Sequence, residues 1–407
     1  MNKHLIILAW RNIWRNKMRT IITLGSIFFA VLLSMMMRSM QLGSYDMMID
    51  NSVRFYSGYL QVHDSAYWEN KSINRMMENT ASLRETIETT AGVESAFTRL
   101  ETFALSASDE LTRPVMVMGI TPEAEDHMSG LAEKLTEGVY LKDQSKGVMI
   151  SEGLSSYLKL GVQDTIVLIG QGYHGVNAAA KYPIEGIIEH PNPQMNKNMV
   201  YLPVALAQSF VYAPNRITSY VINVTDRAQL PAIKKHLKNE LGGEYEVMDW
   251  ADLQPELQQM IESDNSGGVV MMLVLYMVIG FGIFGTIMMM TMERFREFGV
   301  LVAVGMRKVS LATMITLEAL WIGILGVIIS FVVGVPILIS LHENPIPLQG
   351  EAAEAMIKMG VDPVLPFSLN AEVFAMQGIL VLLILMGCLL YPYWKIARMK
   401  VVEAVHA

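Results

Sequence analysis

Residues 293–308, ERFREFGVLVAVGMRK, combine charged, apolar and glycine residues in an order suited to binding another protein. On a helix, Phe298 and Val302 share one face, while Arg294 and Glu297 lie on a different side. Short amphipathic helices of this kind bind in grooves on partner proteins. The alternative interpretation is a connector between two membrane helices that has no docking role.

Two glycines in this segment, Gly299 and Gly305, would let a partner backbone or a sharp turn come close, because they have no Cβ atom. The segment therefore predicts a docking element and no catalytic step. The expected contact residues are Glu293, Arg294, Arg296, Glu297, Phe298, Gly299, Ala303, Gly305 and Met306.

An acidic residue, Glu318, lies inside a long apolar segment that begins after Lys308. A carboxylate in a membrane segment is costly unless it is paired or reaches water, so Glu318 is a candidate functional group. The alternative is a structural pair with a basic residue near the membrane surface.

Motifs for chemistry within this chain are missing. The sequence has no GxxxxGK[ST] loop for nucleotide phosphates, no GxSxG elbow and no HExxH metal motif. Its eight histidines show no metal-ligand spacing. We therefore expect no catalytic, cofactor-binding or metal-binding residues here, and nothing in the charge pattern suggests nucleic acid as a partner.

Four long apolar segments surround these residues and identify a membrane protein with a sizeable extramembrane part. Hydrophobic residues make up 52% of the chain of 407 residues. Each segment reaches or nearly reaches the roughly 20 residues that a helix needs to cross about 30 Å of hydrocarbon. The first lacks a small-residue cleavage site, so we expect a retained anchor instead of a signal peptide. The expected spans are residues 20–42, 266–292, 309–340 and 373–394.

Basic residues cluster before the first span, within 293–308 and after the fourth span, whereas the connection 341–372 is acidic. By the positive-inside rule, both termini and 293–308 are cytoplasmic, and the large segment 43–265 lies outside. Residues 1–19 predict a cytoplasmic amphipathic helix at the membrane surface or, alternatively, a simple basic flank. Residues 395–407 would form a cytoplasmic tail.

The external segment alternates strand patterns with helical patterns, which predicts an α+β domain. The stretch 217–250 has the pattern strand, helix, strand, with Gly242 and Gly243 ending the helix. A β-rich insertion is expected at about 136–214. External helices are expected, among other places, at about 70–91, 226–241 and 250–262.

Three motifs resemble those of the MacB/FtsX-type ABC transporter permeases. In that family a cytoplasmic coupling helix of the form ER-x-REIG-x-x-x-A-x-G precedes a helix with an EA-x-x-x-G pattern. The N-terminal AWRNIWRNKMRT and the C-terminal YPYWKIARMKVVEAVHA are similar to the two ends of the family sequence, although Phe298 stands where isoleucine is usual. The matching residues in the central and C-terminal motifs are Glu293, Arg294, Arg296, Glu297, Gly299, Ala303, Gly305, Glu318, Ala319, Pro392, Trp394, Ala397, Arg398, Glu403 and Ala404.

Within that superfamily, GYLQVHDSAYW and MDWADLQPELQQMIESD are similar to segments of lipoprotein-releasing (LolC/LolE-type) permeases. The resemblance implies an α-helical membrane protein with four transmembrane helices and a large external α+β domain, made of a porter-like part and an inserted β-rich part. It implies a permease subunit of the bacterial inner membrane that is not itself an enzyme. The subunit would pair with itself or with a second permease.

The same resemblance implies a stand-alone ABC ATPase dimer, which binds ATP and Mg²⁺, docked on the coupling helix. The cargo would be a lipoprotein or another hydrophobic molecule, lifted from membrane lipid and passed to a periplasmic carrier. Tyr173, in the loop GQGYHGVNAAAKY, is the expected carrier contact. Met36, Met40 and Met271 are candidate cargo contacts, or equally ordinary membrane-helix residues.

Two rival functions remain open. One is an FtsX-like transmembrane regulator whose external domain activates a cell-wall hydrolase. The other is a MacB-like efflux permease that joins an outer-membrane conduit. Knowing the neighbouring genes, especially whether they encode a stand-alone ATPase and a second permease, would discriminate between these functions.

Overall fold

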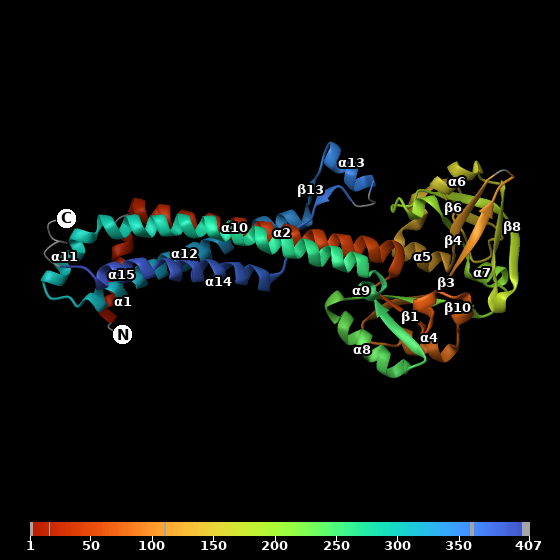
Figure 1. Cartoon of the computed structure of the whole chain (residues 1–407), viewed down its shortest axis with the longest axis horizontal. Coiled ribbons are helices and arrows are strands. Elements are labelled where there is room, and N and C mark those ends of the chain that lie inside the picture. Colours follow the sequence, from red (N-terminus) through yellow and green to blue (C-terminus); the bar gives the residue numbers. More distant parts are fainter. Residues whose placement is uncertain (1–2, 16, 110, 359–361, 401–407) are drawn as a thin grey trace. The chain divides into compact units, whose positions relative to one another are not determined.

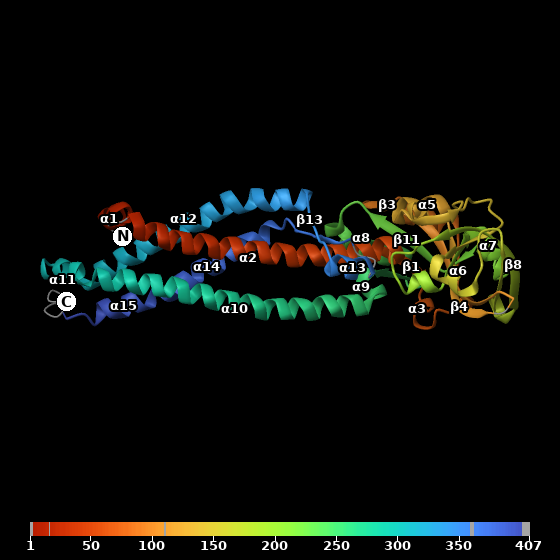
Figure 2. The ribbon, with the colours of Figure 1, turned by 90° about the horizontal axis from the view of Figure 1, so that it is seen from above.

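The computed structural model describes residues 3–15, 17–109, 111–358 and 362–400. The expected tail 395–407 is therefore described only as far as Lys400. The chain divides into two compact units. The membrane unit comprises residues 1–46, 260–347 and 364–407, and the α+β unit comprises residues 47–259 and 348–363. Figures 1 and 2 show the elements of both.

Four helices in the described residues are long and apolar enough to cross a membrane. With 36 and 39 residues, α2 and α10 are each longer than 50 Å at about 1.5 Å per residue, so they continue past the hydrocarbon. A short break at Leu389 separates α14 from α15 within the fourth expected span. The bounds are α2 Lys17–Ser52, α10 Pro255–Glu293, α12 Lys308–Glu343, α14 Ala371–Cys388 and α15 Leu390–Ala397.

Glycines set the packing of α12 against its neighbours. A Cβ atom on Gly326 would lie 2.7 Å from Ile27 Cγ2, and one on Gly323 would lie 2.4 Å from Leu385 Cδ2. Small residues allow this close approach between membrane helices. By contrast, the apolar stretch of α10 is largely exposed within this chain, with Phe281 70% exposed.

The first helix, α1 (Lys3–Arg15), packs on α12 through Ala9 and Ile13, which are buried. The ring centroids of Trp10 and Trp321 are 5.6 Å apart. Trp14 is 57% exposed, as suits a residue at lipid headgroup depth. The expected helix over 1–19 corresponds to α1 and the first residues of α2, and residues 1, 2 and 16 lie outside the described residues.

The two largest hydrophobic cores of the α+β unit share a single strand, β3 (Val93–Ala107). The first half of β3 pairs with β11, which pairs with β1, which pairs with β12. The helices α4 and α8 cover this layer (Figure 1). The bounds are β1 Leu60–Asp64, β11 Ser219–Val224, β12 Tyr245–Asp249, α4 Ala81–Glu88 and α8 Leu230–Leu241.

The second half of β3 begins a closed ring of strands in the order β3-β4-β9-β6-β8-β7 and back to β3. The ring interior is filled by aliphatic side chains such as Val117, Ile150 and Leu168. This small barrel has no open edge between its first and last strands. The bounds are β4 Thr112–Ile120, β6 Val148–Ser151, β7 Thr165–Gln171, β8 Asn177–Ile188 and β9 Met199–Pro203.

Shorter elements complete both units. A β-hairpin and a helix stand in the expected external connection 341–372. The elements are α3 Tyr67–Asn70, β2 Met77–Glu78, α5 Pro122–Ser129, β5 Leu135–Gly138, α6 Glu152–Leu158, α7 Val204–Phe210, β10 Arg216–Ile217, α9 Trp250–Leu253, β13 Ile346–Pro347, α13 Glu351–Lys358 and β14 Val364–Leu365.

Three expected boundaries differ from the structure. The β-rich part begins near Leu100 and not near 136, because the second half of β3 and all of β4 belong to the barrel. The helix expected over 70–91 is confined to α4, which begins after Thr80, whose Oγ1 accepts a hydrogen bond from the Leu83 amide. The helix expected over 250–262 is interrupted at Gln254, before the proline that begins α10.

Candidate functional site

The expected docking segment forms a separate short helix, α11 (Phe295–Ala303), between α10 and α12. Its end is set by Gly305, which has φ +110°. The Met306 amide donates to the Leu301 carbonyl at 3.0 Å, and the Gly305 amide donates to the Val302 carbonyl at 3.1 Å. This pair of hydrogen bonds is a Schellman motif, which stops a helix and turns the chain.

One side of α11 is buried against the membrane unit. Phe298 is 1% exposed and belongs to a cluster with Leu311, Ala312 and Ile396. Gly299 is also buried. Phe298 and Gly299 therefore offer no exposed surface within this chain, and both residues form the base on which α11 rests.

The opposite side of α11 presents an apolar ridge between two arginines. Val304 is 84% exposed and Val300 is 47% exposed. Together with exposed Ala303, they lie between exposed Arg296 and Arg307. The positions 296, 300, 303 and 304 share one helical face, and Arg307 follows the turn at Gly305 that ends the helix. We call these five residues, Arg296, Val300, Ala303, Val304 and Arg307, the α11 ridge.

Beneath the ridge, Glu318 is paired with Arg294. Arg294 Nη1 lies 2.8 Å and 2.9 Å from the two carboxylate oxygens. The two side chains are 9% and 6% exposed. Asn12 Nδ2 donates to the same carboxylate at 3.4 Å, and the Arg294 guanidinium lies 5.4 Å from the centre of the Phe298 ring. The structural pairing that the sequence left as an alternative for Glu318 is therefore present.

A second, exposed ion pair lies beside this buried one. Arg15 Nη2 of α1 lies 2.6 Å from Glu297 Oε2, and Arg294 Nε lies 3.4 Å from the same oxygen. Partial burial alone would raise the pKa of Glu297, but Arg15 and Arg294 together lower it below its usual value. Because Arg15 and Glu297 are 60% and 51% exposed, this pair orients α1 more than it stabilises the fold.

The charged cluster joins three elements: α1 through Asn12 and Arg15, the start of α11 through Arg294 and Glu297, and α12 through Glu318. A cavity of about 30 Å³ adjoins the buried pair and is otherwise lined mostly by apolar side chains. The arrangement holds three helices in a fixed relation and contains no group positioned for bond chemistry. In the residues that the structure describes, no cluster of His, Cys, Asp or Glu could hold a metal ion.

The other expected contact residues differ in how exposed they are. Glu293 is exposed beside the helix junction, and Met306 packs partly against the Phe298 cluster. Met36 is half-buried on α2, while Met40 is 36% exposed and Met271 is 64% exposed. These three methionines have surface available to lipid or to another helix, and nothing in their surroundings distinguishes them from other membrane-facing residues.

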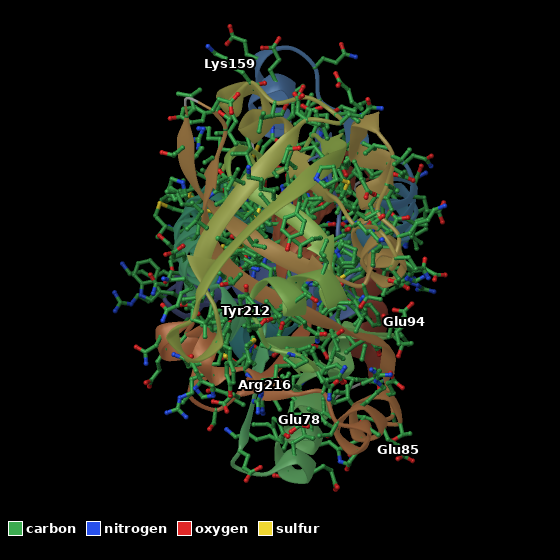
Figure 3. All side chains as sticks on the ribbon, turned by 90° about the vertical axis from the view of Figure 1, so that its right-hand side faces the viewer. Glu78, Glu85, Glu94, Lys159, Tyr212 and Arg216 are labelled. Carbon is green, nitrogen blue, oxygen red and sulfur yellow. The ribbon has the colours of Figure 1, made fainter. Side chains whose placement is uncertain are left out.

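Tyr173 lies at the tip of the hairpin formed by β7 and β8, and that tip is bonded to other parts of the domain. Its amide donates to the Val211 carbonyl at 2.7 Å, and the Arg216 guanidinium lies 4.9 Å from its ring centre. Arg216, which Figure 3 labels, belongs to β10, the strand that pairs with β2. The next amide, of His174, donates to Asn74 Oδ1 at 2.8 Å. The tip between β7 and β8 is thus fastened to the domain, which counts against Tyr173 as a carrier anchor.

Five contributors to the site were missed from sequence: Asn12, Arg15, Val300, Val304 and Arg307. The spacing of Arg296, Val300 and Val304 by four residues was a usable signal for the ridge. No comparable signal linked α1 to α11, because the contact is made in three dimensions.

Two protein-family models match the chain. The MacB-like periplasmic core domain matches residues 20–240, and the FtsX-like permease C-terminal model matches residues 269–401. The first covers more than half of the chain, and the second includes α11 and Glu318.

Curated relatives agree with these models. The lipoprotein-releasing system transmembrane protein LolC of Xylella fastidiosa strain 9a5c is 21% identical over 308 residues, which cover 73% of this chain and 74% of the relative. The LolC protein of the Temecula1 strain is 20% identical over the same shares.

Among solved structures, the periplasmic region of MacB from Actinobacillus actinomycetemcomitans aligns with a TM-score of 0.37 and 14% identity, covering 52% of this chain and 96% of that one. The extracellular domain of the transporter YknZ from Gram-positive bacteria aligns with a TM-score of 0.35 and 12% identity, covering 47% and 100%. On the family-model matches, together with four membrane-type helices and the short helix α11 between two of them, this chain belongs to the MacB/FtsX-type permeases of ABC transporters.

Proposed function

We propose that this chain is the membrane subunit of a lipoprotein-extracting ABC transporter. A separate ATPase dimer, bound to the α11 ridge, would drive the transporter. The observation that carries the proposal is an exposed apolar ridge on a base that is buried and clamped by charge. A helix of this kind suits a groove on a partner. ATP and Mg²⁺ would bind in that partner, and a second permease, identical or related, would complete the complex.

The proposed orientation places α1, α11 and both termini in the cytoplasm and the MacB-like domain in the periplasm of a bacterial inner membrane. Support comes from the basic residues of α1, of α11 and of the segment after α15. In this orientation Trp10 and Trp14 lie at the inner headgroup level, where aromatic and cationic side chains are favoured.

Motion of the ATPase would reach the bundle through the base of α11. A push on Val304 or Val300 tilts a helix whose opposite side is fixed by Phe298 and by the Arg294–Glu318 pair. Because Glu318 lies in α12, the tilt moves α12 and the α1 segment clamped to it. Packed interiors transmit displacement because they compress little.

A lipid-modified protein is the cargo we favour. The support is the similarity to LolC, whose name describes a lipoprotein-releasing system. Lifting one acyl chain out of a bilayer costs about 0.8 kcal/mol per methylene, or about 10 kcal/mol or more per chain, so an energy source and an acceptor are needed. The exposed apolar length of α10 gives acyl chains a surface to follow.

The test begins with Val304→Arg and a matched control, Val309→Arg. Both valines are exposed, at 84% and 66%, but Val309 lies in α12, beyond the turn at Gly305. We expect Val304→Arg to abolish co-purification of the ATPase and release of a lipid-modified reporter from spheroplasts, while Val309→Arg retains both. Equal behaviour of the two variants would remove the ridge from the proposal.

Cargo and partner class are tested by photo-crosslinking probes at Val304 and Met40, which are both exposed. An ATPase captured at Val304 together with lipoproteins at Met40 supports extraction. An ATPase at Val304 with no lipoprotein at Met40, and a cell-wall hydrolase bound by the periplasmic domain, would mean a signal transmitter. No ATPase at Val304 would overturn the proposed docking.

A further inference from the structure

A directed chain of hydrogen bonds joins α2 to α10 where both helices leave their apolar stretches. Arg38 Nη1 donates to Asn265 Oδ1 at 2.8 Å and to Gln41 Oε1 at 2.7 Å. Gln41 Nε2 donates to the Tyr45 hydroxyl at 2.8 Å, and that hydroxyl donates to Asp264 Oδ2 at 2.6 Å. We call these five residues, Arg38, Gln41, Tyr45, Asp264 and Asn265, the latch.

The charges of the latch are balanced along its length. Arg38 can only donate and the Asp264 carboxylate can only accept, so the Gln41 amide and the Tyr45 hydroxyl between them are ordered in one direction. Charge-assisted bonds at both ends are stronger than bonds between neutral groups. Tyr45, in the middle, is 8% exposed, so little water competes for its hydroxyl.

The latch lies where the uncharged stretches of α2 and α10 end. In α2 the uncharged stretch ends at Arg38, and in α10 it begins just after Asp264 and Asn265. Between these points and the opposite ends, α10 is largely exposed within the chain, although Ile283 and Ile287 pack in the shared core. The latch is thus a polar fastening at one end of a pair of helices whose packing elsewhere is sparse.

We propose that the latch is a positioning device that keeps α2 and α10 moving as one body during the transport cycle. This inference rests on the proposed function. In it, the latch transmits motion from the membrane helices to the parts of α2 and α10 that continue beyond their apolar stretches. Without the latch, α2 and α10 part at their outer ends and ATP hydrolysis continues with little cargo release. The latch residues touch neither cargo nor nucleotide in this scheme.

A neighbouring glycine provides a mild way to break the latch. A Cβ atom on Gly268 would lie 1.9 Å from Gln41 Nε2, whereas nothing lies within 4 Å of a Cβ on Gly267. Gly268→Ala therefore displaces the Gln41 amide, which connects Arg38 to Tyr45, without altering any charge. Gly267→Ala is its matched control on the same helix, with the same change in helix propensity.

The experiment uses the full complex in proteoliposomes and measures reporter release per ATP hydrolysed. We expect Gly268→Ala and Tyr45→Phe to lower this ratio roughly three- to tenfold, as loss of one or two partly buried hydrogen bonds would do. Gly267→Ala should match the wild type. Equal ratios in Gly268→Ala and Gly267→Ala would overturn the inference.

A covalent replacement of the latch gives the decisive comparison. The double variant Gln41→Cys, Gly268→Cys is made in a Cys388→Ser background and joined by a short bis-maleimide. The untreated protein should be uncoupled and the joined protein should regain coupling. Loss of release on joining, or no gain from it, would show that the helices must part or that the latch does nothing.

Failure of the proposed function gives a different signature. If the wild-type complex hydrolyses ATP and releases no lipid-modified reporter, the cargo proposal is wrong. The latch is then judged by spin labels at Met40→Cys and Met271→Cys, in the Cys388→Ser background. The inference requires a broader distance distribution in Gly268→Ala than in Gly267→Ala, and identical distributions would refute it.

Discussion

Removing one member of the buried Arg294–Glu318 pair should cost far more than removing one member of the exposed Arg15–Glu297 pair. Glu318→Ala leaves the Arg294 guanidinium, whose side chain is 9% exposed, with only its 3.4 Å contact to half-exposed Glu297. Removing one partner of a buried ion pair destabilises a protein by about 3–5 kcal/mol, and the longer Glu297 contact places this variant near the lower value. Glu297→Ala breaks an ion pair of half-exposed side chains and should cost at most about 1 kcal/mol.

The double variant Arg294→Met, Glu318→Leu separates the cost of an orphaned charge from the worth of the pair. Because it removes both charges, we expect its stability to return to within about 1 kcal/mol of the wild type, as for other buried pairs replaced by apolar residues. The coupling energy follows once Arg294→Met and Glu318→Leu are also measured singly. With about 3 kcal/mol lost in each and about 1 kcal/mol in the double variant, it is about 5 kcal/mol, above the range of up to about 3 kcal/mol that is usual for residues in contact.

Unfolding in mixed micelles with increasing SDS provides the assay. Tryptophan fluorescence is a suitable signal, because Trp321 lies three residues after Glu318 and contacts Trp10 of α1. We expect Glu318→Ala to unfold at a much lower SDS fraction than Glu297→Ala. The double variant should unfold near the SDS fraction of the wild type. If Glu318→Ala and Glu297→Ala unfold at the same SDS fraction, the assignment of Arg294–Glu318 as the fixed base of α11 is wrong.

Three further predictions concern other parts of the chain. Gly305→Ala forces a side chain into the left-handed region, at a cost of about 1–2 kcal/mol, and should weaken ATPase co-purification, while Gly282→Ala, where nothing lies within 4 Å of the added Cβ, should not. Burial lowers the pKa of both His63 and His190 to about 4, so each is neutral at pH 7; the stability that this gives is complete above pH 6.5 and is lost as pH falls through 4. The free energy of unfolding of the α+β unit, measured in urea, should therefore fall as the pH drops from 6.5 to 4, by up to about 1.4 kcal/mol per pH unit for each histidine. His63→Asn should reduce this pH dependence, and a wild-type free energy that does not change with pH would contradict the burial. Arg99→Met should destabilise the same unit by about 3 kcal/mol or more, because it orphans buried Glu125, and adding Glu125→Leu should recover most of the loss in the urea midpoint.

Much of the fold could be predicted from local sequence patterns. The alternation in TRPVMVMGI matches β4, and Gly242, with φ +71°, ends α8 where its lack of a side chain predicted. The four membrane helices follow from hydropathy alone. In each case the deciding physics lies within about twenty residues of chain, so a window of sequence contains it.

The features that escaped prediction depend on residues far apart in the chain. Segment α11 has apolar residues on two sides, and its sequence does not say whether the phenylalanines or the valines are buried. The partner of Glu318 is brought to it by the turn at Gly305, and the latch joins Arg38 to Asn265. The start of the barrel was misplaced because β3 is one uninterrupted strand, whose pattern does not change where it leaves one core and enters the other.

The sharing of β3 between two cores has a consequence for the order in which the domain acquires structure during synthesis. All strands of the barrel precede β11 in the chain, so the ring is complete once β9 has been made. The other layer must wait, because Leu60 pairs with Ile222 and with Asp249. Distant pairings form slowly unless their ends are already held. A folded barrel fixes one half of β3, and the other half then presents an ordered edge on which β11 can assemble, followed by β1 and β12.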